Sequence, residues 1–203
     1  MTRVDKNQNI GICLYLQTYV ELSTYRVNEI CKILSNVLES LSSVNTLETP
    51  GSSTSSLLNM VRQLLELMRT VSSSLTSLMS CLQRLLKKPG YLLPLCLMLP
   101  HLSKISVLTS RFAVTLAELQ TMCPNIVVNL PHSKTPTWSL ASLLNVLGSS
   151  VKELDSDMLV IYRNVLELYT QSMDCLIMSS FPNLERHITQ IQHSLYPSLK
   201  NHI

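Results

Sequence analysis

Apolar residues recur at alternating intervals of three and four along four long segments of this chain. A mean spacing of about 3.5 residues keeps one stripe of a helix against its neighbours, and it is typical of helices that pack at shallow angles. The second segment follows the pattern without exception, through Leu57, Val61, Leu64, Met68, Val71, Leu75, Leu78, Leu82 and Leu85. The pattern therefore predicts an all-α fold.

The other three series predict three further helices. The first series is Cys13, Leu16, Val20, Ser23, Val27, Ile30, Leu34, Val37, Leu41 and Val44. The third is Leu102, Ile105, Thr109, Phe112, Leu116 and Leu119, and the fourth runs Leu140, Leu144, Leu147, Val151, Leu154, Met158, Ile161, Val165, Leu168, Ser172 and Cys175. We expect a single helical domain over 1–203, an elongated bundle of four long heptad-patterned helices plus a short C-terminal helix. The expected helices cover about 12–47, 55–88, 101–122, 138–180 and 183–195.

Proline and polar residues mark the expected ends of these helices. Residues 49–53 (TPGSS) separate the first two helices, and 123–137, with three prolines, form a loop between the third and fourth. Asp155 and Asp157 favour caps over helix interiors, so we expect them to cap a kink or restart in the fourth helix near 155. Pro182 suits the first position of the final helix.

The most apolar stretch, Tyr91–Leu102, raises the question of a membrane span. A spanning helix needs about 20 apolar residues, and the charges of Lys88 and Lys104 leave a shorter interval here. Pro94 and Pro100 are expected to prevent a continuous helix. We therefore predict a buried connector between helices and no transmembrane segment.

The surface chemistry is unusual because charged residues make up 14% of the chain, against about 25% in typical proteins. Serine, threonine and leucine occupy positions that glutamate and lysine usually hold on helical bundles. The net charge of +3, without a basic stripe, argues against nucleic acid as a partner. Either the chain is poorly soluble alone or other proteins cover much of its surface.

Two sets of residues are candidates for a partner interface. The second predicted helix carries apolar side chains beside its core stripe, which requires neighbours on more than one side. A central place in the chain's own bundle and a covering partner helix both explain this. In the fourth helix two tyrosines stand one heptad apart, either as core-edge residues or as a contact ridge. The candidates are Leu58, Leu65, Leu67, Met79, Leu86, Tyr162 and Tyr169.

No pattern for catalysis, metal binding or cofactor binding is present in the sequence. The histidines include no pair four residues apart, there is no H-E-x-x-H motif, and glycine is too rare for a phosphate-binding loop. The six cysteines show no C-x-x-C spacing, and the first residues form no apolar leader. We expect a protein that is not an enzyme, has no cofactor and resides inside the cell, in the cytoplasm or nucleus.

These observations favour a non-catalytic subunit or adaptor of a larger intracellular assembly, which acts by helix–helix packing with one or more helical partners, obligate partners included. Two alternatives stay open. One is a self-sufficient four-helix ligand of the cytokine type, which long helices and long connections allow. The other is a peripheral membrane or host-manipulating viral factor that lays an apolar helical face on lipid or on a host protein.

Overall fold

The computed structural model describes residues 3–45, 52–87, 92–122, 127–129 and 137–180. Within them lie four helices, α1 (Arg3–Asn45), α2 (Ser52–Lys87), α3 (Leu92–Met122) and α4 (Leu140–Ser180). The strands β1 (Val127–Asn129) and β2 (Thr137–Ser139) form an antiparallel ribbon. The all-α bundle is confirmed, whereas the expected helix at 183–195 lies outside the described residues.

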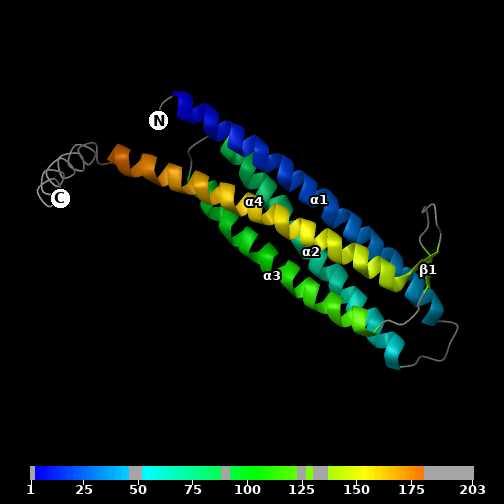
Figure 1. Ribbon diagram of the computed structural model, residues 1–203. Helices are drawn as coiled ribbons and strands as arrows, with labels where there is room; N and C mark the ends of the chain where they lie inside the picture. Colours follow the sequence, from blue (N-terminus) through cyan, green and yellow to red (C-terminus); the bar gives the residue numbers. More distant parts are fainter. Residues whose placement is uncertain (1–2, 46–51, 88–91, 123–126, 130–136, 181–203) are drawn as a thin grey trace, which may run out of the picture.

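The four helices are arranged in a ring in which each runs antiparallel to the one before it (Figure 1). α2 packs extensively against both α1 and α3, and α4 closes the ring with lighter contacts to α3 and α1. The result is an up-down-up-down bundle, elongated along the helix axes. The short links between α1, α2 and α3 favour this order because they allow only antiparallel neighbours.

The core consists of the residues that the heptad spacing selects. All nine positions of the second series are buried. The positions of the other three series whose burial the structure describes are buried as well. Burying a leucine side chain fully stabilises a fold by roughly 1.5–3 kcal/mol, so these stripes dominate the folding energy. The largest fully buried side chains are Phe112, Leu16, Ile30, Leu34, Leu41, Leu64, Met68, Leu75, Leu78, Leu82, Leu95 and Met98.

The predicted connector at 91–102 is wrong, because α3 begins at Leu92 and continues through both prolines. Pro94 lies in the first turn, where backbone N–H groups have no partner within the helix. Pro100 lies inside the helix and costs it a hydrogen bond to the carbonyl of Cys96. Packing of the buried residues Leu95 and Met98 offsets this cost.

Two further expectations about the second half of the chain are also wrong. α4 is continuous through 155–157, so neither Asp155 nor Asp157 caps a helix. The loop expected at 123–137 contains β1 and leads directly into β2, with Val128 opposite Trp138. Trp138 packs partly buried against the core and β1 contacts α1, so the ribbon lies against α1 beside the start of α4.

Candidate partner-binding surface

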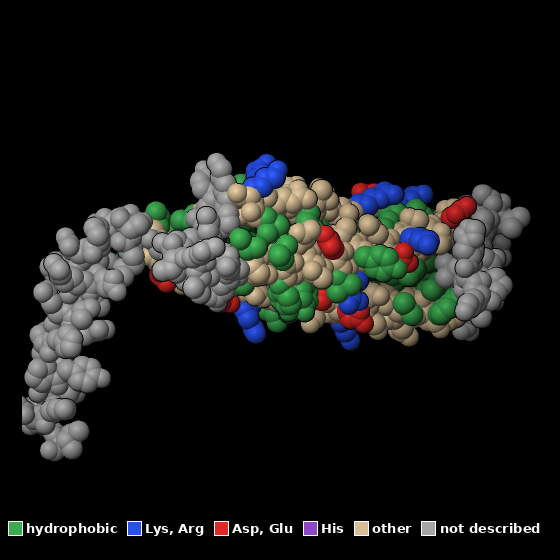
Figure 2. All heavy atoms as spheres, turned by 90° about the horizontal axis from the view of Figure 1, so that it is seen from above, with side chains coloured by type: hydrophobic (Ala, Val, Ile, Leu, Met, Phe, Trp, Pro, Cys, Tyr) green, Lys and Arg blue, Asp and Glu red, His purple; other side chains and the backbone are tan. Residues whose placement is uncertain are grey.

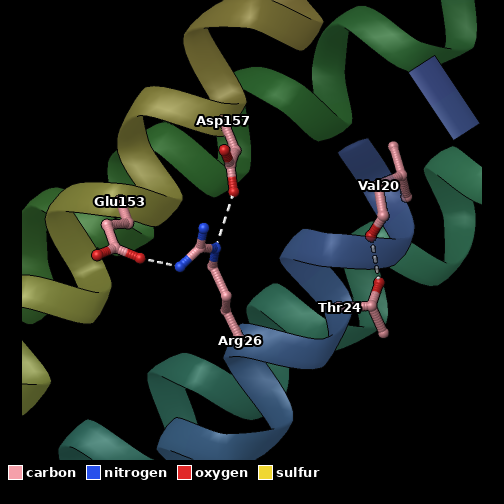
Figure 3. A network of polar contacts seen from close by, with 5 residues as sticks. All are labelled: Val20, Thr24, Arg26, Glu153 and Asp157. Carbon is pink, nitrogen blue, oxygen red and sulfur yellow. Dashed lines mark hydrogen bonds and ion pairs between the residues drawn. The ribbon is translucent and has the colours of Figure 1, made fainter. Parts of the chain in front are cut away.

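An ion pair sets the position of α4 against α1. The Nε of Arg26 donates a hydrogen bond to Oδ2 of Asp157 at 3.0 Å, and its Nη1 pairs with Oε2 of Glu153 (Figure 3). The Asp157 side chain is only 12% exposed, whereas that of Glu153 is 58% exposed. A charge pair that is this well buried fixes register, because sliding the helices would leave a carboxylate buried alone.

This register places a second apolar stripe of α4 on the outside of the bundle. Each member follows a core position by one residue and so lies about 100° around the helix from the core stripe. Leu159 is 62% exposed, Tyr162 45% and Leu166 44%. We call the whole stripe the α4 ridge: Leu159, Tyr162, Leu166, Tyr169, Met173 and Leu176.

Beside the ridge, the surface between α3 and α4 is hollowed. Two adjoining hollows of about 470 and 400 Å³ share Asp155 and run along the two helices. The α3 side carries small residues at helical spacing. On the α4 side, a Cβ atom added to Gly148 would lie 3.6 Å from Cδ2 of Leu116, so the two helices are close together at this point. We call this hollow the α3–α4 groove, lined by Ser103, Ser106, Ser110, Ala113, Ala117, Gly148, Lys152, Asp155, Leu159 and Tyr162.

The residues expected at an interface divide into two groups. Leu58 and Leu65 are only 6% and 4% exposed, and Leu67, Met79 and Leu86 are partly buried against the same core. The close packing of α2 against both α1 and α3 accounts for their apolar character. Tyr162 and Tyr169 instead lie together on the α4 ridge, one exposed and the other partly buried.

Sequence reasoning missed the leucines and the methionine of the ridge. Leu159, Leu166 and Met173 have the same heptad spacing as the tyrosines, so a search for a second apolar stripe would have found them. The small residues of the α3 side gave no comparable signal. Their role depends on α4 passing close by, which only the three-dimensional arrangement reveals.

The outer surface agrees with the low charge of the sequence. Figure 2 shows one face on which apolar and neutral side chains form broad areas and charged side chains are scattered in small groups. Many serine and threonine hydroxyls on the helices donate to the carbonyl four residues earlier, as Thr24 does to Val20 at 2.7 Å (Figure 3). Such hydroxyls donate to a carbonyl of their own helix and add no charge to the surface.

The described thiols are free, and they differ in exposure. Burial raises the pKa of the Cys13 and Cys81 thiols, and for Cys81 the charge of Arg84 acts in the opposite direction. Burial likewise raises the pKa of Cys31, opposed by Arg69. Cys96 is exposed on α3. Among the described residues no group of three or more histidine, cysteine, aspartate or glutamate side chains could hold a metal ion.

By length and composition alone, α3 is long and apolar enough to cross a membrane. One third of its most apolar 18-residue stretch is buried in the bundle. The core helix of a water-soluble bundle meets the same criterion.

No protein-family model, curated protein or solved structure matches this chain.

Proposed function

We propose that the chain is a non-catalytic helical subunit or adaptor of a larger intracellular assembly, and that it binds an amphipathic helix of a partner protein in the α3–α4 groove. The observation that carries this proposal is the α4 ridge, a heptad-spaced apolar stripe in which Leu159, Tyr162, Leu166 and Leu176 are exposed. Single exposed leucines are ordinary on protein surfaces. A series of them with helical spacing beside a groove is typical of helix-in-groove recognition.

The groove suits a helix for two reasons. Its α3 side includes five serine and alanine residues, whose small side chains leave room for another backbone to approach closely. Its α4 side supplies large anchors in Leu159 and Tyr162. Covering a half-exposed leucine gains roughly 1 kcal/mol, so several ridge residues together can offset part of the cost of association.

Site-specific photo-crosslinking in native cells tests this proposal. A photoreactive phenylalanine analogue at Leu159 should form a covalent adduct with a partner, which mass spectrometry identifies. The same analogue at Ser73, exposed on α2, is the control and should give no such adduct. Adducts of equal yield at both positions, or none at Leu159, would remove the groove as the binding surface.

A lipid-binding role is the second candidate, favoured by the apolar outer face of α3. Leu93, Leu97, Val107 and Val114 are all exposed on that helix. If this face lies on lipid, the chain should float with anionic vesicles, and the double variant L93E/L97E should not. A cytokine-type ligand has no comparable support, since such bundles are up-up-down-down and this one alternates.

A further inference from the structure

Four charged side chains on the outer face of α4 make no ion pair with any other residue that the structure describes. They are Lys152, Asp155, Arg163 and Glu167, and all four are exposed. Glu167 accepts a hydrogen bond from the neutral Gln171 at 3.1 Å. The four charges are therefore available to pair with charges on another molecule.

The order of these charges around Leu159 suits the pairing of α4 with a second α4. Asp155 lies four residues before Leu159 and Arg163 four residues after it, while Lys152 lies seven before and Glu167 eight after. When two identical helices pack antiparallel about a twofold axis at Leu159, residues equally far before and after it lie level, because each residue advances a helix by about 1.5 Å. Each charge then lies level with an opposite charge on the second copy.

We propose that the chain forms a homodimer through α4, with the twofold axis at Leu159. Asp155 of each copy pairs with Arg163 of the second copy, and Lys152 pairs with Glu167 in the same way. Leu159, which is 62% exposed, meets its own counterpart at the axis.

The hollow beside Leu159 takes part in the same contact. Because the axis is perpendicular to the paired helices, α3 of each copy lies on the same side of the α4 pair. The hollow lined by Leu159 also contains Val107 of α3, which is 50% exposed. The hollows of the two copies therefore face each other, and the dimer covers apolar surface of α3 as well as of α4.

The charges favour this alignment over others that the apolar ridge allows. An axis between Tyr162 and Arg163 would set Leu159 level with Leu166 of the second copy, but it would also bring the two Arg163 side chains together. A parallel pair of helices would set every charge level with its own counterpart. Like charges that meet at an interface oppose association, so the antiparallel pair centred on Leu159 is the favoured one.

This inference goes beyond the proposed function, because it requires no protein other than a second copy of this chain. Both proposals use Leu159, so a dimer competes with a partner helix for the α4 ridge. Purified protein tests the dimer alone. A purified chain that stays monomeric would leave the partner in cells to be decided by photo-crosslinking at Leu159.

Charge reversal in the purified full-length chain tests the pairing. D155R sets arginines level with each other and R163E sets carboxylates level with each other, so each variant should raise the dimer Kd at least about tenfold in sedimentation equilibrium. Mixed together, the two variants should dimerise with a Kd within about threefold of the parent. One chain then carries positive charge at both positions and the other carries negative charge at both.

The control is E39R, which makes the same change of charge at an exposed position of α1 and should leave the Kd unchanged. Because Asp155 and Arg163 are exposed, both variants should keep the unfolding temperature of the parent. A parent chain that is monomeric at the highest soluble concentration would overturn the inference. So would a mixture of D155R and R163E that fails to associate, or an effect of E39R as large as that of D155R.

Discussion

Ser23 occupies a core position of α1 and is completely buried, and its hydroxyl has no hydrogen-bond partner. A buried polar group without a partner costs about 1–3 kcal/mol. We therefore expect Ser23→Ala to raise the free energy of unfolding by about 1 kcal/mol, measured by urea denaturation. Ser73→Ala, at an exposed position of α2, is the control because it gains the same helix propensity without burial. A gain no larger than that of the control would contradict the explanation.

Arg26 makes the polar contact on which the position of α4 depends most. Arg26→Met should lower the free energy of unfolding by about 2–3 kcal/mol, because it leaves the buried carboxylate of Asp157 without a cation. Glu153→Gln should cost less than about 1 kcal/mol, since that carboxylate is largely exposed. The double variant R26M/D157L should recover most of the loss. If the double variant stays as unstable as R26M, packing rather than the charge explains the loss.

The free thiols should differ in reactivity. Maleimide should modify Cys96 well before Cys13 and Cys81, which are buried and whose pKa values burial raises. Because the thiolate is the reacting form, a raised pKa leaves less of it at neutral pH, and labelling of Cys13 should accelerate as the pH rises. Peptide mass spectrometry after timed labelling gives the order. Early modification of Cys13 would contradict its place in the core.

At the scale of the elements, α3 contains a residue that destabilises its own helix. Pro100 is exposed and interrupts the hydrogen bonds of the helix, so Pro100→Ala should stabilise the bundle by about 1–2 kcal/mol. Pro94 is buried in the first turn, where proline costs no hydrogen bond, and Pro94→Ala should be slightly destabilising. Thermal unfolding of the two variants checks the contrast. A loss of stability in P100A would mean that the proline is required for the shape of α3.

The helices could be predicted from the sequence, and their departures from prediction have identifiable causes. The spacing of Leu57, Val61 and Leu64 is a local pattern, so it indicated both the helix and its buried side. The continuation of α3 through Pro100 depends on packing against α2 and α4, which overrides a local penalty of about 3 kcal/mol. The spacing alone gave no sign of that packing.

The candidate site was less predictable than the fold, for a similar reason. Tyr162 and Tyr169 could be recognised as members of one helix face, but their exposure depends on how α3 lies beside α4. The partner of Asp157 is Arg26, more than half the chain away, and no local pattern connects the two. A carboxylate that resembled a cap in sequence is therefore an anchor between helices.

At the scale of the whole molecule, the separation of core from ridge allows solubility and stability to be changed independently. Leu159 and Leu166 are largely outside the core, so the double variant L159E/L166E should keep the unfolding temperature within about 2 °C of the parent chain. It should also reduce concentration-dependent self-association, measured by sedimentation, because the exposed apolar stripe is interrupted by charge.

The control for this prediction is Val114→Glu, which adds a charge at an exposed apolar position of α3 away from the ridge. If general surface hydrophobicity drives self-association, V114E should reduce it in proportion to the charge added. If the ridge drives it, V114E should have little effect, because Val114 lies on α3 outside the ridge. A large fall in unfolding temperature in L159E/L166E would instead place these leucines within the energetic core. The bundle would then need its outer stripe for its own folding and would have none to offer a partner.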